Sequence, residues 1–319
     1  MIWLAGIDEA GYGPTLGPLV VSATLWRIEE PADSIDLWRD LRSCVCRAGS
    51  RRDWRLVIDD SKAAFDRKQG LHSLERTVLA FAGAVHAPTD RLDALLAHLT
   101  SAGAPAAQMP WYQRLDIPLP LDAQTRSTAV LSEKLTQSFS AANATCVGLL
   151  AEIITEDRYN ARVERTHNKG AVLLEHVLKL IDRLSRRAAG QTLRICVDRL
   201  GGRAGYGGRL REAFPERHLE ELLVSEDVSR YRLRGERDVW EIEFATESEQ
   251  RHLPVALASM LAKYVREGLM AQFNAFWCGL QPGLTPTAGY YKDAQRFLSD
   301  IGKLLPQVGL EREQFVRSR

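Results

Sequence analysis

The sequence predicts an α/β protein in which a mixed central sheet is flanked by helices. Apolar runs of strand length recur along the chain, and stretches with apolar residues at helical spacing alternate with them. The 319 residues are 45% hydrophobic and 26% charged, which is typical of an ordinary globular protein. This length allows one large domain or two small ones, and we expect a single domain over residues 1–319.

Charge and cysteine content bear on nucleic-acid binding and on the redox state of the thiols. The formal net charge is +1, so binding to a polyanion would depend on a local patch and not on a global basic field. The five cysteines include no CxxC pair, and we expect reduced thiols in a cytoplasmic protein. No signal-peptide pattern and no apolar run of membrane-spanning length occurs, so we expect no contact with a membrane.

The N-terminal stretch 6–14 is the first candidate site. The apolar residues from Ile2 to Ala5 indicate a buried strand, and Asp8 and Glu9 follow where it should end. Neighbouring strand residues point to opposite faces, so only one of the two carboxylates can point away from a given face. An acidic turn on an exposed hairpin is the simpler interpretation.

Glycines follow these acids directly. Gly11 and Gly13 flank Tyr12, and glycine allows a backbone to approach a ligand closely. A second apolar run, from Leu19 to Leu25, predicts the next strand. Carboxylates joined to a Gly-x-Gly-Pro loop between two strands are less common than an acidic turn alone, and we interpret the stretch as a site.

Residues 57–62 (Val-Ile-Asp-Asp-Ser-Lys) precede a helical pattern. Asp60 or Ser61 would make structural sense as the N-cap of this helix.

Residues 86–145 stand apart, with helices expected over 90–100 and 129–141, and we treat them as an insertion of unknown role.

The insertion contains one aromatic segment, Met-Pro-Trp-Tyr at 109–112. It could stack on the bases of a nucleic acid. Packing between the inserted helices is the more common use of such residues.

Residues 146–154 indicate a strand, and Asn168 and Lys169 then open a helix with one apolar face. His176 lies on that face, where a core histidine with a satisfied partner is more common than a catalytic group.

The next strand, 193–198, ends in Asp198. An aspartate in this position is often a helix cap. The arginines that follow, Arg199, Arg203 and Arg209, would suit a rim that faces phosphates.

The stretch from Thr246 to Lys263 supplies another acid. Small and apolar residues from Val255 onward have helical spacing. Ahead of them, Glu249 is the candidate acid and Glu247 is its competitor. Charged residues before a helix otherwise serve as partners of the helix dipole.

Together these motifs resemble the type 2 ribonuclease H family, ribonucleases HII and HIII. Asp-Glu before Gly-x-Gly, Asp-Ser-Lys, a strand-ending Asp and Thr-x-x-Glu-x-x-His-Leu-x-Val-Ala occur in that order. The resemblance covers residues 1 to about 85 and about 146 to 300. It implies a ribonuclease H-like mixed sheet flanked by helices, with a helical insertion and a helical C-terminal part. The Asp-Glu-Asp-Glu acid set is HIII-like, but we expect no HIII N-terminal accessory domain.

The resemblance also implies the site residues. The catalytic and metal-binding acids would be Asp8, Glu9, Asp198 and Glu249. The substrate-binding residues would be Gly11, Tyr12, Gly13, Lys62, Asn168, Lys169, Lys263 and Tyr290, with Arg266 as a further candidate for holding phosphate.

Two departures from the family pattern concern substrate recognition. Tyr12 replaces the Arg, Lys or Thr usual between the two glycines. Leu284 stands where a tyrosine is expected to stack at the ribonucleotide junction, and Tyr290 and Tyr291 are the candidates to replace it.

Clustered carboxylates repel one another unless cations are present. Hard oxygen ligands with few His or Cys indicate Mg²⁺ or Mn²⁺, and two such ions can support hydrolysis of a phosphodiester. The resemblance implies a metal-dependent endonuclease that cuts the RNA strand of RNA/DNA hybrids or ribonucleotides embedded in duplex DNA, leaving 5′-phosphate and 3′-hydroxyl ends, and we expect a monomer. The alternatives are a nucleic-acid-binding protein that has lost ribonuclease activity and a structure-selective DNA nuclease.

Overall fold

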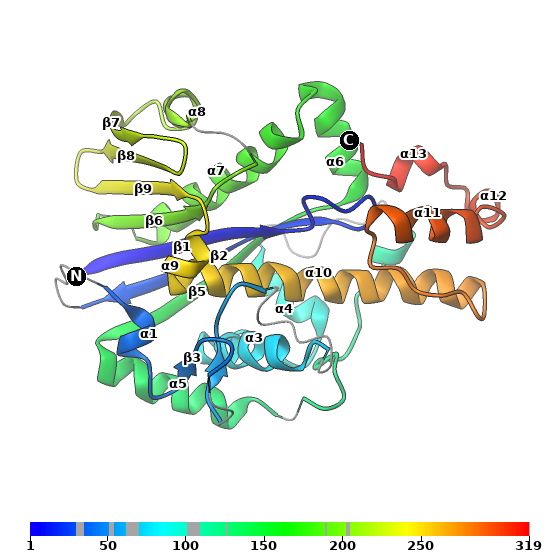
Figure 1. Cartoon of the computed structure of the whole chain (residues 1–319), viewed down its shortest axis with the longest axis horizontal. Helices are drawn as coiled ribbons and strands as arrows, with labels where there is room; N and C mark the ends of the chain where they lie inside the picture. The colour runs from blue at the N-terminus through cyan, green and yellow to red at the C-terminus, as the bar shows by residue number, and fades with distance from the viewer. Residues whose placement is uncertain are drawn as a thin grey trace.

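A seven-stranded mixed sheet forms the centre of the computed structural model (Figure 1). Its strands lie in the order β5-β2-β1-β6-β9-β8-β7. The pairs β1–β6 and β6–β9 are parallel, and the other neighbouring pairs are antiparallel. The strands are β1 (Ile2–Ala10), β2 (Leu19–Ile28), β5 (Ala144–Ile154), β6 (Leu193–Asp198), β7 (His218–Val224), β8 (Val228–Arg234) and β9 (Val239–Ala245), with β3 (Val45–Cys46) and β4 (Leu56–Val57) in a separate two-stranded sheet.

The structure describes a defined part of the chain. The described residues are 1–29, 35–50, 54–61, 70–100, 109–125, 127–188, 190–201 and 205–318. Lys62 and Arg203, both expected near phosphate, lie outside them.

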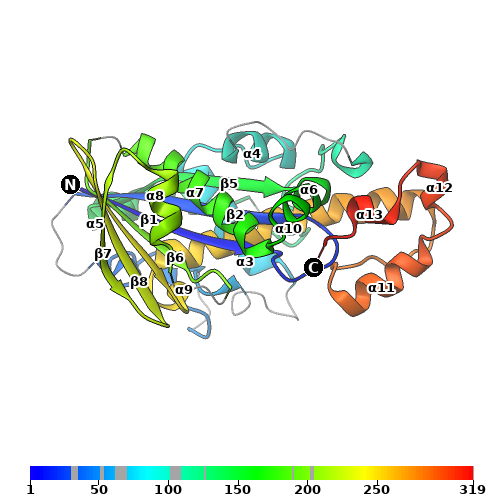
Figure 2. The same ribbon diagram turned by 90° about the horizontal axis from the view of Figure 1, so that it is seen from above.

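Helices cover both faces of the sheet (Figure 1). α10 lies against β1 and β2 on one face together with α3, α4 and α5, and α7 covers the other face. α11 and α12 lie beyond the sheet, at the C-terminal end of α10 (Figure 2). In the described part of the chain, no helix is both long and apolar enough to cross a membrane. The helices are α1 (Leu37–Asp40), α3 (His72–Ala84), α4 (Leu92–Leu99), η1 (Pro110–Tyr112), α5 (Ala129–Ala142), α6 (Glu156–Thr166), α7 (Lys169–Arg187), α8 (Gly207–Ala213), α9 (Ser248–Arg251), α10 (Leu253–Leu280), α11 (Tyr291–Asp300), α12 (Leu305–Val308) and α13 (Arg312–Phe315).

Alternation along β1 divides the hydrophobic core in two. Leu4 is buried in the cluster that contains α10, whereas Ile7 is buried in the cluster that contains α7. Gly6 lies on the α10 side, where a Cβ would stand 2.1 Å from the carbonyl carbon of Pro254. Strand and helix therefore touch backbone to backbone, and the next residue on this face is Asp8.

The expected fold class, a mixed sheet flanked by helices, is confirmed. The predicted strands at 19–25, 146–154 and 193–198 correspond to β2, β5 and β6, and the predicted helices at 90–100 and 129–141 correspond to α4 and α5. β1 runs on to Ala10, so Asp8 and Glu9 are part of the strand and not of a turn beyond it.

Among the described elements that were not expected from the sequence, β8 and α6 have few apolar residues. β8 buries Tyr231 and Leu233 but has charged residues between them, and α6 buries Tyr159 and Val163 in an otherwise charged helix.

The described residues of the insertion are part of the core. Trp111 is fully buried, and its ring centroid lies 5.0 Å from that of Phe273 on α10. Phe139 of α5 packs against Trp26 of β2. Packing is therefore the role of the 109–112 aromatic segment, but against α10 and not between the inserted helices as expected, and its buried rings are not a platform for bases.

The contact at Gly6 gives a stability prediction. We expect Gly6→Ala to lower the free energy of unfolding by at least about 2 kcal/mol, because the added methyl group overlaps the backbone of α10. Urea denaturation would measure this change. Gly279→Ala on the same helix is the control: a Cβ there meets nothing within 4 Å, so stability should stay the same or rise by up to about 1 kcal/mol. Equal stability of the two variants would contradict the backbone contact.

Candidate active site

Two carboxylates lie side by side at the carboxyl ends of β1 and β6. The parallel ladder pairs Ile7 with Val197, and the next residues in this register are Asp8 and Asp198. Neighbouring strands are about 4.8 Å apart, and alternation puts both side chains on the face that α10 covers. Asp8 is only 9% exposed.

The turn after β9 brings a third acid to the same place. Ala245 ends β9 beside Asp198, Glu247 then adopts a left-handed backbone with φ of 52°, and the Ser248 N–H donates to Asp198 Oδ1 at 3.1 Å. Glu249 follows, and its Oε2 is buried without a hydrogen-bond partner among the described residues. Glu247 is exposed, so the structure places Glu249 and not its competitor beside the acids.

The Asp-Asp-Ser segment is fixed against the same acids. The Ser259 hydroxyl of α10 lies 3.2 Å from Ser61 Oγ and also within hydrogen-bonding reach of the Asp8 carboxylate, so its single proton is shared between these two neighbours. The Asp59 carboxylate accepts a hydrogen bond from the Ala48 N–H at 3.0 Å, which holds the segment in place. The motif that precedes Lys62 is therefore next to the site, although Lys62 itself is not described.

Asp60 is a fifth carboxylate that the sequence analysis treated only as a helix cap. Its negative charge raises the pKa of both Asp198 and Glu249. The pair of acids directly before Ser-Lys was the signal that could have identified it. We add Asp60 to the acid row, which we define as Asp8, Asp60, Asp198 and Glu249.

Burial and mutual repulsion raise the pKa values of these groups. The pKa of Asp8 lies well above its usual range, first because of burial and then because of the charges on Glu9 and Asp198. Burial also raises the pKa of Asp198. The pKa of Glu249 rises to about 7, again through burial first and then the charge of Asp198. The acid row therefore favours bound protons or cations.

The donors of the acid row fit a hard divalent cation. All are carboxylate oxygens, and Glu249 Oε2 can bind an ion without losing a hydrogen bond to the described residues. The acids form a row and do not surround one point: among the described residues, the three possible ligands with atoms within 4.8 Å of one another are Cys196, Glu243 and His252.

The Cys196 group is an ion-pair cluster. Arg230 Nε donates to Glu243 Oε2 at 2.6 Å, and His252 Nε2 lies 3.3 Å from Glu243 Oε1. The His252 hydrogen bond, followed by the Arg230 interaction, lowers the pKa of Glu243 to about 2. Because this carboxylate already has two nitrogen partners, we assign no metal to it.

Glu9 approaches the acid row from the other side of β1. It pairs with Val21 of β2, and Val21 belongs to the core on the α7 face. Cross-strand partners share a face, so alternation directs Glu9 away from α10. Its backbone N–H nevertheless donates to Asp8 Oδ1 at 2.7 Å, and its charge raises the pKa of Asp8.

The Gly-x-Gly loop is held by two buried arginines. Gly11 has φ of +88°, and a Cβ there would lie 2.6 Å from Arg266 Nε. Arg317 donates to the carbonyl of Gly11 and, at 3.3 Å, to that of Tyr12. A Cβ on Gly13 would meet nothing within 4 Å, so the loop is fixed on one side and open on the other.

Tyr12 lies between the N-terminus of α7 and the loop after β6. Lys169 Nζ is 5.1 Å from the centroid of the Tyr12 ring, and the ring is 3.4 Å from where a Cβ of Gly201 would stand. Asn168 caps α7 by accepting a hydrogen bond from the Ala171 N–H at 3.1 Å. The structure therefore gives Asn168 a structural role and leaves Lys169 exposed beside Tyr12.

The two cations of α10 differ. Arg266 is 1% exposed and donates to the carbonyls of Leu16 and Ala288 at 3.1 and 3.2 Å. This contradicts the expectation that Arg266 holds phosphate, because its guanidinium is buried and links the loop at Leu16 to the loop at Ala288. Lys263 pairs with Glu267 on the same helix and stays partly exposed.

The C-terminal tyrosines lie close to the Gly-x-Gly loop. The Thr15 N–H donates to the Gly289 carbonyl at 2.8 Å, and Tyr290 and Tyr291 follow with 54% and 53% of their surface exposed. Leu284 is buried. The exposed tyrosines, and not residue 284, are therefore available to a ligand.

The chain is similar to several solved structures. Ribonuclease HII of Archaeoglobus fulgidus, in complex with PCNA, is 14% identical with a TM-score of 0.44, and the match covers 99% of this chain and 92% of that chain. Ribonuclease H2 of Pyrococcus horikoshii OT3 is 14% identical with a TM-score of 0.44, over 98% and 92% of the two chains. Bst-RNase HIII in complex with Mn²⁺ is 17% identical with a TM-score of 0.36, over 95% and 64%.

These similar structures are type 2 ribonucleases H. No protein-family model matches the chain, and no curated protein matches its sequence. At such low identity we take the activity from the geometry of the site and not from these similarities.

The raised pKa of Glu249 predicts the pH dependence of stability. An unfolded glutamate titrates near 4.3, so the metal-free folded protein binds more protons between about pH 4.3 and 7, and its stability falls as the pH rises through this window. Glu249→Gln should remove part of this fall and raise the free energy of unfolding at pH 8 by about 1–2 kcal/mol, after allowance for partial exposure. Denaturant unfolding across this range measures the effect.

The matched control is Glu247→Gln, which removes the same charge two residues away at an exposed position. It should leave the pH dependence unchanged. If the two variants behave alike, Glu249 is not part of a repelling cluster.

Proposed function

We propose that the chain is a divalent-metal-dependent endonuclease of the type 2 ribonuclease H kind. The observation that supports this most is the acid row, in which β1, β6 and α9 bring one buried and two half-buried carboxylates together and leave Glu249 Oε2 without a partner among the described residues. Such an arrangement is costly without cations, so it is best explained by ion binding. The chemistry would be hydrolysis of a phosphodiester.

Mg²⁺ or Mn²⁺ would be held by Asp8, Asp198 and Glu249, with Glu9 and Asp60 close by. When bound, two such ions supply an activated water and stabilise the leaving oxygen of an in-line displacement. The protein keeps the acids in place: the Ser248 N–H holds Asp198, and Ser259 holds Asp8. We propose Asp8 as the central ligand, because it is buried and the charges of both Glu9 and Asp198 act on it.

The Gly-x-Gly loop would recognise the ribonucleotide. Its open backbone at Gly13 can approach a 2′-hydroxyl, the group that distinguishes RNA from DNA. Arg317 and Arg266 fix the loop before substrate arrives. Lys169, Lys263 and Lys62 are proposed phosphate contacts, and exposed Tyr290 is proposed to stack at the junction.

The proposed substrates are RNA/DNA hybrids or duplex DNA with embedded ribonucleotides, and the products would be 5′-phosphate and 3′-hydroxyl ends. The alternative is a nucleic-acid-binding protein without activity. It is favoured by Tyr12, which stands where the family pattern has Arg, Lys or Thr, and by the displaced tyrosine. The intact acid row opposes it, because an unused cluster of buried carboxylates would only destabilise the fold.

Cleavage assays would test this proposal. Three labelled duplexes are needed: one with a single embedded ribonucleotide, one RNA/DNA hybrid and one all DNA, each with Mg²⁺, Mn²⁺ or EDTA. We expect cleavage only of ribonucleotide-containing strands and only with a metal ion. Asp8→Asn should lower the rate by at least about 10³-fold, because several kcal/mol of transition-state stabilisation would be lost.

Glu247→Gln is the matched control and should retain wild-type activity. Tight binding of the hybrid without cleavage under any metal condition would favour the binding protein. Cleavage of the all-DNA duplex would instead indicate a structure-selective DNA nuclease.

A further inference from the structure

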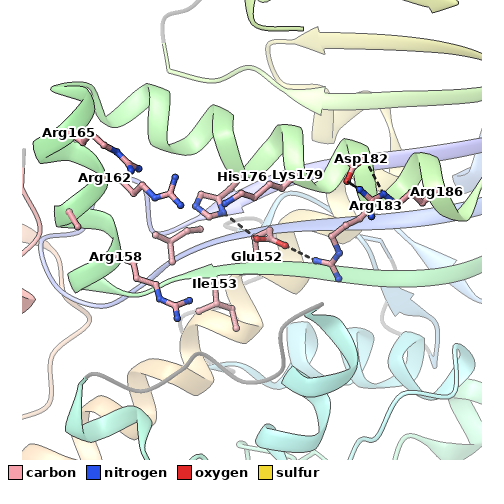
Figure 3. Close-up of a pocket in the computed structure, with 12 residues that line it drawn as sticks. Glu152, Ile153, Arg158, Arg162, Arg165, His176, Lys179, Asp182, Arg183 and Arg186 are labelled. Carbon is pink, nitrogen blue, oxygen red and sulfur yellow. Dashed lines mark hydrogen bonds and ion pairs between the residues drawn. The ribbon is translucent and has the colours of Figure 1, made fainter. Parts of the chain in front are cut away.

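A pocket of about 660 Å³ lies outside the acid row, between α6, α7 and the edge strand β5 (Figure 3). Cationic side chains surround it, and Glu152 and Ile153 of β5 lie between the two helices. Six cations and two carboxylates line it, a formal charge of +4 in a chain whose net charge is +1. We call it the basic pocket, with cations Arg158, Arg162, Arg165, Lys179, Arg183 and Arg186.

The spacing of these cations is regular. On α6 they occur at positions 158, 162 and 165, and on α7 at 179, 183 and 186. Each set follows i, i+4, i+7, so each helix presents one basic ridge to the same pocket. Each ridge is about 10 Å long, which corresponds to about three phosphates along one strand of a duplex.

Not all of these charges are neutralised by the protein. Four of the six cations have carboxylate partners: Arg162 and Lys179 share Glu175, Arg186 pairs with Asp182, and Arg183 pairs with Glu152. Arg158 and Arg165 make no hydrogen bond or ion pair with the described residues, and both are exposed. Unpaired like charges around one pocket favour a bound anion.

The pocket lacks the groups that hold a base. Apart from His176, which is buried against Glu152, no aromatic side chain of the described residues lines it. Binding would thus involve phosphates and not base stacking or base edges. This favours the backbone of a nucleic acid over a free nucleotide.

The position of the pocket connects it to the acid row. Lys169, at the start of α7, lies over Tyr12 of the Gly-x-Gly loop. Lys179, in the basic pocket, is ten residues further along the same helix, a distance of about 15 Å. A duplex that reaches the acids could therefore extend along α7 into the pocket.

We propose that the basic pocket binds the phosphate backbone of the duplex that flanks the cleavage site. The identity of the duplex rests on the proposed function, whereas binding of a phosphate backbone rests on the pocket alone. The contacts are independent of sequence, and they add affinity only for substrates long enough to reach α6.

The test measures binding separately from cleavage, in the Asp8→Asn background. Fluorescence anisotropy would follow a hybrid of about 30 base pairs and one of about 8 base pairs over a series of salt concentrations. The variant Arg158→Gln/Arg165→Gln is compared with Arg234→Gln/Arg237→Gln. The control pair is exposed and lies at the opposite end of the sheet, around the turn between β8 and β9.

The pocket variant should bind the long hybrid about tenfold more weakly, and the slope of log K against log salt should become shallower by about 1.8, the value for two lost phosphate contacts. Its affinity for the short hybrid should match that of the control, which also shows that the variant is folded. Equal slopes for both variants on the long hybrid would overturn the proposal and leave the proposed function intact.

Two further results would also overturn it. In the first, inorganic tripolyphosphate binds the parent protein but not the pocket variant, while both proteins bind the long hybrid equally well. The site would then bind a small polyphosphate. If none of the proteins binds any duplex, the proposed function fails together with the pocket proposal.

Discussion

Repulsion between carboxylates that the sheet holds together is the constraint on which the rest of the structure depends. The β1–β6 ladder fixes Asp8 beside Asp198 whether or not a cation is present, because backbone register and not side-chain attraction sets their separation. The contact of Gly6 with the backbone of α10 then presses Ser259 and the Asp8 face together. The fold thus stabilises an arrangement that its charges oppose, as expected where the arrangement serves a reaction.

The surrounding loops follow from the same constraint. Glycine conformation alone would leave the loop after β1 mobile, but Arg266 and Arg317 reach it from α10 and from the C-terminal segment. These arginines are 1% and 4% exposed, so their guanidinium groups hydrogen-bond backbone carbonyls and do not face the solvent. Segments more than 200 residues apart therefore preorganise one edge of the site, and such preorganised groups act without reorganisation when substrate binds.

The sequence predicted those features that have a local pattern. Asp8 and Asp198 end apolar runs, and the Gly-x-Gly motif marks its own loop. Asp60 was missed as a site residue because its place beside the acids depends on distant contacts: its neighbour Ser61 hydrogen-bonds Ser259, almost 200 positions away. Arg266 was misassigned because charge suggests phosphate, and only packing reveals that its guanidinium is buried. α6 and the basic pocket were not seen because a charged helix has a weak apolar pattern, and two ridges become a pocket only after folding.

The central claim is that the acid row binds divalent cations, and the most direct test is a crystal structure after a Mn²⁺ soak. Anomalous scattering would locate the ions without assumption about ligands. We expect one or two peaks within about 2.0–2.4 Å of the carboxylate oxygens of Asp8, Asp198 or Glu249, with Glu249 Oε2 among the ligands. An acid row without ions at saturating Mn²⁺, or an ion only at Cys196, Glu243 and His252, would contradict the account.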